Sequence, residues 1–286
     1  MALLTLVRDL LQTPAVATAL WIGSIVAVVS GCAGVFTVVR GQSFAGHALG
    51  DVGSTGAAAA YLTAVQPLYG FLGIGLLGGL AIDRLGNRAR ERDVATGIVL
   101  SLTMGLSALL LFLITEQTSA TGGPLSILFG SIFTVAPAVT LPVELFSLLA
   151  LGLLAVLYRP LVFASLSPET ARARGVPVGL VGTLFMVALV IAVEESSLVA
   201  GALLSTALLI GPAAAAVNWT RQIGHTLALS AFLGVAAVVL GIVLSYESYF
   251  WPPLHRGWPV SFFIVMLVLV EYIASRLWRR RREATA

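Results

Sequence analysis

The amino-acid sequence predicts an all-α, polytopic integral membrane protein with about nine transmembrane helices. Hydrophobic residues make up 58% of its 286 positions, and the mean hydropathy is +1.01. Charged residues make up 10%, against about 25% in soluble proteins, which is too few to cover a water-exposed surface of this size. A sizeable soluble domain is therefore excluded, and we expect residues 1–286 to form a single transmembrane domain.

Nine apolar runs give the expected helices. A bilayer core about 30 Å thick is crossed by about 20 apolar residues in a helix. Runs near this length lie at residues 15–39, 43–65, 67–82, 94–115, 142–163, 177–195, 198–217, 226–246 and 259–277. The run from Pro67 is short for a span, and only residues 194–197 separate the sixth run from the seventh, so eight or ten spans also fit the sequence.

Two further apolar segments lie outside these runs. Residues 1–14 combine leucines with Arg8 and Asp9 and end at Pro14, which is typical of a helix on the membrane surface. No small-residue cleavage pattern stands there, so we expect this segment to be retained on the outer face. Leu125 to Phe133 is too short to span, and we expect a re-entrant or interfacial segment covered by protein.

The arginines indicate the orientation of the chain. The sequence has 16 arginines and no lysine. With nine spans and the tail Arg279 to Arg282 in the cytoplasm, 14 of the 16 fall inside, and only Arg8 and Arg256 fall outside. Cytoplasmic loops carry an excess of positive charge, so the sequence predicts an N-out, C-in topology. The net charge of +3 reflects these loops and does not indicate a nucleic-acid partner.

Several chemistries are excluded by the residues that the sequence lacks. Without lysine there is no P-loop for ATP, and the single cysteine, Cys32, can form neither an intrachain disulfide nor a cysteine zinc site. Residues 73–78 match G-x-G-x-x-G but lie inside an apolar run, without the strand and acidic residue of a dinucleotide site. They indicate close helix packing instead. We expect neither an enzyme active site nor a bound cofactor in this chain.

His47 and Asp51 are the leading candidates for a functional pair. They lie four residues apart in an expected helix and so share one face, and ionisable groups at membrane depth are costly to keep. An imidazole and a carboxylate can bind zinc, manganese or iron(II), and a symmetric second chain would double the two ligands to four. The alternative is a His–Asp hydrogen bond that only fixes helix packing.

Glu194 and Glu195 are expected at the outer end of a helix. Two interpretations remain open for them. Carboxylates in that place are ordinary in a solvated turn between two spans. They could equally stand at the entrance of a pathway for cations.

Residues 165–175 form the most informative connection on the cytoplasmic side. Ser167 and Pro168 are typical of a helix start, and Gly175 followed by Pro177 is typical of a helix end. A charged helix of about two turns is therefore predicted between two spans. It could dock into a groove of a soluble partner or serve as a plain interfacial linker, and the residues alone favour neither.

Three stretches match the pattern of a known family. Residues 169–175 (ETARARG) are similar to the E-A-A-x-x-x-G signature of importers, and residues 201–216 to a G-x-L-L-x-x-A-L-L-x-x-P-A-A-x-A run. Residues 127–132 are similar to an L-F-G segment. With these stretches the chain resembles, over nearly its whole length, the permease subunits of zinc, manganese and iron ABC importers, the ABC-3 family.

The resemblance extends to the candidate metal ligands, with one departure. An early helix of the family typically carries Asp-Ala-Leu-Ser-His-Ala, whose aspartate and histidine belong to the metal pathway. The matching residues here are 47–52 (HALGDV), so His47 and Asp51 occur in exchanged order. The exchange keeps the spacing and the donor set and leaves the geometry and the identity of the metal open.

The resemblance implies a permease of the bacterial plasma (inner) membrane that dimerises around a central pathway. Such a subunit takes a divalent ion, zinc or manganese foremost, from an extracytoplasmic metal-binding protein and is driven by a separate ATPase. Glu169, Arg172, Arg174 and Gly175 would then couple it to the ATPase, and Pro212 would kink or break its helix near the pathway.

Several points stay open after the resemblance. The second subunit could be an identical copy or a paralogue. An ATP-independent secondary metal transporter and a membrane scaffold without a transport role remain the alternatives to an ATP-driven permease.

Overall fold

The computed structural model is a bundle of helices. It describes residues 13–86, 89–118, 127–130, 132–134, 137–202, 205–251 and 257–285, and no strand occurs among them. The helices are α2 (Pro14–Val39), α3 (Ser43–Leu62), α4 (Pro67–Leu85), α5 (Ala89–Thr118), the 3₁₀ turn η1 (Ile132–Thr134), α7 (Pro137–Leu166), α8 (Pro168–Ala173), α9 (Val178–Ala200), α10 (Ser205–Trp219), α11 (Ile223–Ser248) and α12 (Val260–Thr285).

The predicted membrane architecture is confirmed in its main feature. Each of the nine apolar runs overlaps a helix, although the run 198–217 begins in the last turn of α9 and reaches α10 only after the break at Gly201. In the described part of the chain seven helices are long and apolar enough to cross a membrane: α2, α4, α5, α7, α9, α11 and α12. The other two are α3, which carries His47 and Asp51, and α10, which has only 15 residues. Arg8, Arg256 and the expected surface helix at 1–14, up to residue 12, lie outside the described residues.

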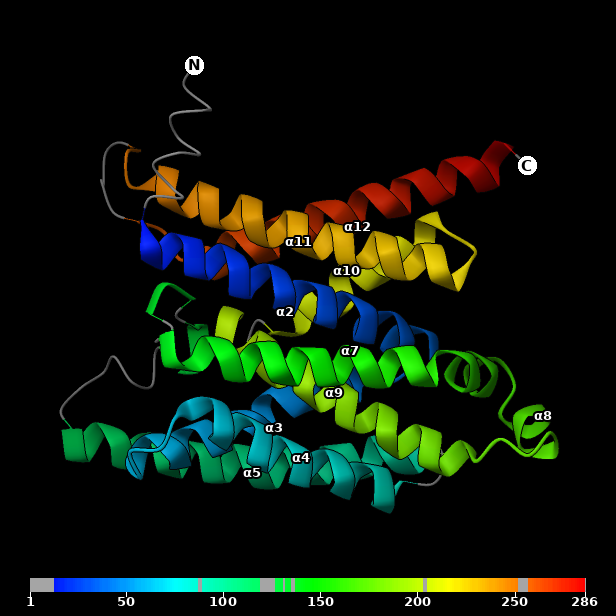
Figure 1. Ribbon diagram of the computed structural model, residues 1–286, viewed down its shortest axis with the longest axis horizontal. Coiled ribbons are helices and arrows are strands. Elements are labelled where there is room, and N and C mark those ends of the chain that lie inside the picture. The colour runs from blue at the N-terminus through cyan, green and yellow to red at the C-terminus, as the bar shows by residue number, and fades with distance from the viewer. Residues whose placement is uncertain are drawn as a thin grey trace.

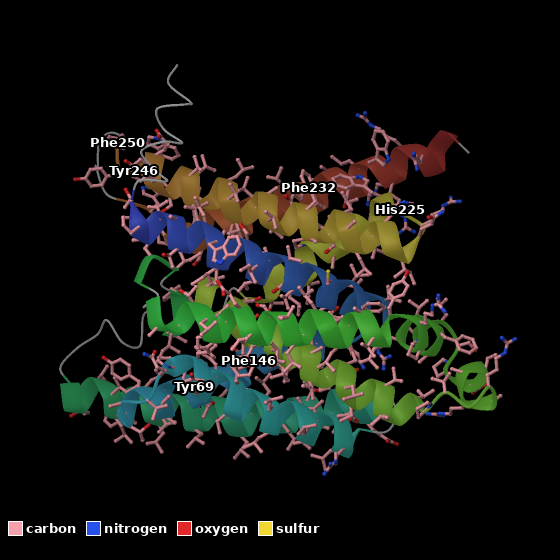
Figure 2. All side chains as sticks on the ribbon, in the orientation of Figure 1. Tyr69, Phe146, His225, Phe232, Tyr246 and Phe250 are labelled. Carbon is pink, nitrogen blue, oxygen red and sulfur yellow. The ribbon has the colours of Figure 1, made fainter. Side chains whose placement is uncertain are left out.

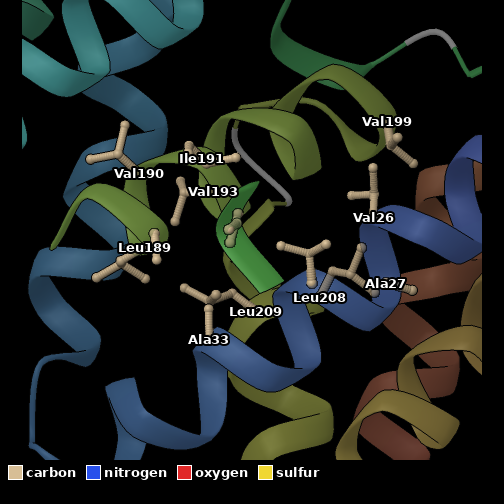
Figure 3. Packing of buried hydrophobic residues seen from close by; sticks show 14 of the residues in the cluster. Val26, Ala27, Ala33, Leu189, Val190, Ile191, Val193, Val199, Leu208 and Leu209 are labelled. Carbon is tan, nitrogen blue, oxygen red and sulfur yellow. The ribbon is translucent and has the colours of Figure 1, made fainter. Parts of the chain in front are cut away.

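α2 and α9 form the centre of the bundle. α10, α11 and α12 lie on one side of α2, and α3, α4 and α5 lie on the far side of α9 and α7 (Figure 1). Side chains of α2, α9 and α10 interlock between these layers, among them Ala33, Leu189 and Leu209, which are each 0% exposed (Figure 3). α5 lies at the edge of the bundle. Only 11% of its most apolar 18 residues are buried, so most of its surface is left to face lipid.

Glycines let the helices approach backbone to backbone. A Cβ atom added at Gly56 of α3 would lie 1.9 Å from the carbonyl oxygen of Gly70 of α4, so neither position has room for a larger residue. Gly79, which follows the G-x-G-x-x-G stretch, packs against the side chain of Val190 of α9, and an added Cβ would lie 2.6 Å from its Cγ2. The stretch therefore belongs to a packed helix surface, as expected from the sequence, because small residues replace the missing hydrophobic drive between helices in lipid.

The expected helix end at Glu194 and Glu195 is wrong. α9 continues through both residues to Ala200, and Gly201 then ends it with φ of +92°. The hydroxyls of Ser196 and Ser197 donate to carbonyl oxygens one turn earlier in their own helix, so four polar residues are accommodated without a turn. Neighbouring helices cover residues 194–197, so this polar stretch is buried and does not lie at the surface.

The expected re-entrant segment packs against the break between α9 and α10. The Ala202 N–H donates to the Ile127 carbonyl oxygen at 3.2 Å. Gly130 and Gly201 meet so closely that a Cβ on Gly201 would lie 2.5 Å from the Gly130 nitrogen. The Ser261 hydroxyl of α12 lies 2.8 Å from the Phe129 carbonyl oxygen and 2.9 Å from that of Ala200. Residues 127–129 form a helical turn, and the backbone of residues 127–130 thus contacts the end of α9, the break after it and α12.

Candidate functional site

α3 brings His47 and Asp51 together on one face. Nε2 of His47 lies 3.9 Å from Oδ2 of Asp51, and the two side chains are 45% and 14% exposed. This separation is too long for a hydrogen bond. Two metal–ligand bonds of about 2.1 Å each can span it, so the two atoms could hold one cation between them.

The second nitrogen of His47 reaches another helix. Nδ1 lies 2.8 Å from Oγ1 of Thr206 in the first turn of α10. The sequence alone does not reveal this contact, because Thr206 is 159 positions away and lies in a stretch notable for its apolar residues.

The polar side chains that follow Asp51 turn towards α5. Ser54 donates to the Asp51 carbonyl oxygen at 2.6 Å and lies 3.3 Å from the Ser107 hydroxyl, while Thr55 donates to the Thr103 carbonyl oxygen at 2.8 Å. These bonds fix the rotation of α3 against α5. The pair formed by His47 and Asp51 is therefore held on a helix whose next two polar side chains, Ser54 and Thr55, are already hydrogen-bonded.

Glu194 lies beside this pair, inside the bundle. Its side chain is 0% exposed and is lodged between two glycines: a Cβ on Gly53 of α3 would lie 1.9 Å from Oε2, and one on Gly75 of α4 would lie 2.3 Å from Oε1. Neither oxygen has a hydrogen-bond partner, and the carboxylate of Asp51 is close enough to act on it electrostatically. An orphaned carboxylate in such a place requires a proton or a cation to offset its burial.

Glu195 faces a different neighbour. The Ser147 hydroxyl of α7 donates to its Oε2 at 2.7 Å, its Oε1 has no partner, and the side chain is 0% exposed. The two adjacent glutamates therefore point to different helices. Of the two, Glu194 is the one that joins the wall formed by α3.

A complete metal shell is not formed by the described residues of one chain. Among them, no group of three or more His, Cys, Asp or Glu side chains is arranged to hold a metal ion. Two protein ligands leave most of the coordination positions of a divalent cation open. Further donors have to come from outside this set of residues.

The connection at residues 165–175, between α7 and α9, folds as the sequence predicts. Ser167 precedes α8, and its backbone oxygen accepts the N–H of Ala171 at 3.0 Å, although its hydroxyl turns to Thr170 instead of capping a backbone N–H. At the other end the N–H of Gly175 donates to the Arg172 oxygen and that of Val176 to the Ala171 oxygen, both at 3.0 Å. This is a Schellman end, and it places Gly175 at φ +81°.

The charged residues of this loop are open to a partner. Glu169, Arg172 and Arg174 are exposed, and the guanidinium carbon of Arg174 lies 5.7 Å from the centroid of the Phe163 ring. α8 projects from the end of the bundle where the C-terminus also lies (Figure 1).

Pro212 does not break its helix. α10 is continuous from Ser205 to Trp219, and Pro212 is buried inside it. The helical structure is interrupted earlier, at Gly201, where α9 ends. Proline still removes one backbone N–H from the helix, because its nitrogen carries no hydrogen. A bend at Pro212 stays a prediction.

Comparisons with known proteins agree on one group. The model of the ABC 3 transport family matches residues 12–254. Manganese import system permease protein ScaB of Streptococcus pneumoniae is 31% identical over 238 residues, which are 82% of this chain and 81% of that protein. Manganese transport system membrane protein MntC of Halalkalibacterium halodurans is 30% identical over 226 residues, 77% of this chain and 75% of that protein. The solved structure of PsaBC from Streptococcus pneumoniae in complex with Fab has a TM-score of 0.82 and 26% identity, covering 96% of this chain and 95% of that one.

Proposed function

The chain belongs to the ABC 3 transport family, and on that premise we propose that it is the membrane permease subunit of an ATP-driven importer of divalent metal ions, with manganese as the first candidate. The relatives that carry a manganese name support this choice of ion. One imidazole nitrogen and carboxylate oxygens are also a donor set that manganese accepts, whereas a copper(I) site would require sulfur.

The observation that carries the proposal is the gap between His47 and Asp51. Two donor atoms 3.9 Å apart, without a hydrogen bond between them, leave room for a shared cation. Glu194 places a second carboxylate against Gly53, two residues beyond Asp51 in α3, and its oxygens have no hydrogen-bond partner. We assign His47 and Asp51 to the metal pathway and Glu194 to its buried wall, and Glu195, on the α7 side, to the packing of that wall.

The exposed His47 supports a pathway shared between two subunits. Its side chain is 45% exposed although it lies on a helix of the bundle. A second permease copy or a paralogue placed against this face would cover the imidazole and add its own donors. The cation would then pass between the two chains, with donors from both.

The metal is expected to arrive and leave on opposite sides of a bacterial plasma membrane. We propose nine spans, with α3 and α10 added to the seven long apolar helices, and an N-out, C-in topology. The nitrogen-tipped side chains that gather towards the end with α8 and the C-terminus support this orientation (Figure 2). An extracytoplasmic metal-binding protein would deliver the ion at the opposite end.

ATP hydrolysis is assigned to a separate subunit. The chain has no lysine and so no P-loop of its own, and its relatives are permease or membrane proteins by name. The exposed loop with Glu169, Arg172, Arg174 and Gly175 is the element that would contact that ATPase.

The experiment that tests this function is uptake of Mn²⁺ and Zn²⁺ into proteoliposomes containing the permease, its ATPase and its metal-binding protein. We expect Mn²⁺ uptake that requires ATP and stops when the ATPase is omitted. Uptake that persists without the ATPase would identify a secondary transporter, and no uptake by a well-folded complex would identify a scaffold. Both results would overturn the proposal.

A further inference from the structure

Thr206 is the residue outside α3 that touches the proposed metal pair. Its Oγ1 lies 2.8 Å from Nδ1 of His47, and the opposite ring nitrogen, Nε2, faces Oδ2 of Asp51. On the basis of the proposed function, we infer that Thr206 is a positioning residue. It accepts the Nδ1–H of His47, and this leaves the lone pair of Nε2 directed at the space beside Asp51.

The inference follows from the chemistry of a neutral imidazole. One ring nitrogen carries the proton and the other carries the lone pair, and the hydrogen bond of the first decides which is which. A proton on Nε2 would lie between the ring and Asp51, where a cation would have to bind. A proton on Nδ1, held by Thr206, keeps Nε2 free. Histidines that bind metals generally donate their other N–H in this way.

The packing of α10 against α3 holds Thr206 in register with His47. Gly50 of α3 meets Ser205 directly: a Cβ on Gly50 would lie 2.7 Å from the Ser205 hydroxyl oxygen. Ser205 is itself tied to the break before α10, because its N–H donates to the Gly201 oxygen at 2.9 Å and its hydroxyl donates to the Ala202 oxygen at 3.0 Å. Thr206 follows directly, so it has little freedom to slide along α3.

Residues 127–130 contact the break between α9 and α10, and this contact also helps to fix the register of α10 against α3. Ile127 accepts the Ala202 N–H, and the Ser261 hydroxyl lies within hydrogen-bond distance of the carbonyl oxygens of Phe129 and Ala200. These contacts join α12, the 127–130 segment and the end of α9 immediately before α10 begins. The position of the Thr206 hydroxyl is therefore set by backbone contacts on both sides of the break.

The test compares variants that differ in one hydroxyl group. Thr206→Val keeps the shape of the side chain and removes the oxygen, and Thr206→Ser keeps the oxygen. Thr103→Val is the matched control, because the Thr103 hydroxyl bonds only to the Val99 and Leu100 oxygens of its own helix. His47→Gln is measured alongside to test the metal pair itself. The readouts are the Mn²⁺ concentration at half-maximal uptake in proteoliposomes, Mn²⁺ binding to the purified complex by equilibrium dialysis, and thermal stability.

We expect Thr206→Val to raise the half-saturating Mn²⁺ concentration and the dissociation constant by about 10-fold or more, with unchanged thermal stability. Thr206→Ser and Thr103→Val should stay close to wild type. Wild-type values for Thr206→Val would overturn the inference while leaving the metal pair in place, provided that His47→Gln is impaired. A loss of stability in Thr206→Val with unchanged Mn²⁺ affinity would also overturn it, since Thr206 would then be a packing residue. If His47→Gln also retains wild-type affinity, the proposed metal pair itself fails.

Discussion

The carboxylate of Glu194 lies in the contact between α3, α4 and α9. It is completely buried, and it occupies the space that side chains at Gly53 and Gly75 would need. Gly73, on the same helix as Gly75, has nothing within 4 Å of an added Cβ. A side chain at Gly75 would therefore displace Glu194, whereas Gly73, two residues earlier in α4, has room for one.

We predict that Gly75→Ala displaces Glu194 and impairs Mn²⁺ uptake. The added methyl group would lie 2.3 Å from Oε1 in a closed space, and overpacking of this kind costs about 1–3 kcal/mol. Gly73→Ala, the control, should be neutral or stabilising by up to about 1 kcal/mol, because alanine favours the helix. Thermal unfolding in detergent and uptake in proteoliposomes measure both effects. Equal behaviour of the two variants would contradict the assigned position of Glu194.

The sequence could predict some of the site at this scale but not all of it. The spacing of His47 and Asp51 places both on one helical face without any structure. The position of Glu194 depends on glycine contacts between helices more than a hundred residues apart, and the Thr206 contact spans 159 residues, so no local pattern contains them. The polarity of residues 194–197 predicts a helix end at the glutamates, whereas the helix continues to Ala200 and ends at the helix breaker Gly201.

Among the elements, α8 ends at a single glycine that its backbone conformation requires. Gly175 has φ +81°, a region that costs other residues about 1–2 kcal/mol, and a Cβ there would meet nothing within 4 Å. The backbone conformation, not the lack of space, therefore requires glycine. Start and end of α8 were both predictable, because caps and stops are local signals.

We predict that Gly175→Leu separates ATP hydrolysis from metal uptake. The strained helix end should move Arg172 and Arg174 relative to the ATPase, so uptake should fall by about 10-fold or more while the protein still inserts and folds. Gly179→Leu is the control, because Gly179 is exposed, lies in α9 and has open space around an added Cβ. Uptake per ATP hydrolysed is the measurement. Wild-type coupling in a well-expressed Gly175→Leu variant would count against the role of this loop.

Hydropathy predicts where the helices lie in the sequence better than it predicts which of them cross the membrane. Each of the nine apolar runs overlaps a helix, but α3 and α10 fall outside the group of long apolar helices. α3 carries His47, Asp51 and four glycines, and its neighbours α4, α5 and α9 cover much of its surface. A helix shielded by protein can be less apolar than one that faces lipid, and this is why its composition alone does not establish a span.

For the whole molecule, the topology can be tested with single cysteines. In a Cys32→Ser background, Gln66→Cys lies in the exposed turn between α3 and α4 and Arg221→Cys lies in the exposed turn between α10 and α11. The N-out, C-in arrangement predicts that an impermeant thiol reagent labels Gln66→Cys in intact cells, whereas Arg221→Cys reacts only after the membrane is opened. The reverse pattern would invert the proposed orientation.

The central claim is that His47 and Asp51 handle the transported metal as a pair. Asp51→Asn keeps the size of the side chain and its hydrogen bonding but removes the charge, so a merely structural pair should lose only about 1 kcal/mol of stability. His47→Gln likewise removes the imidazole nitrogen and keeps a polar group.

The most direct measurement is ATP-dependent uptake of radiolabelled manganese and zinc by the reconstituted complex, with the thermal stability of each variant recorded in parallel. We predict that both variants lose most of their uptake while unfolding within a few degrees of the wild type. Wild-type uptake in both variants, or a loss of stability as large as the loss of uptake, would contradict the assignment.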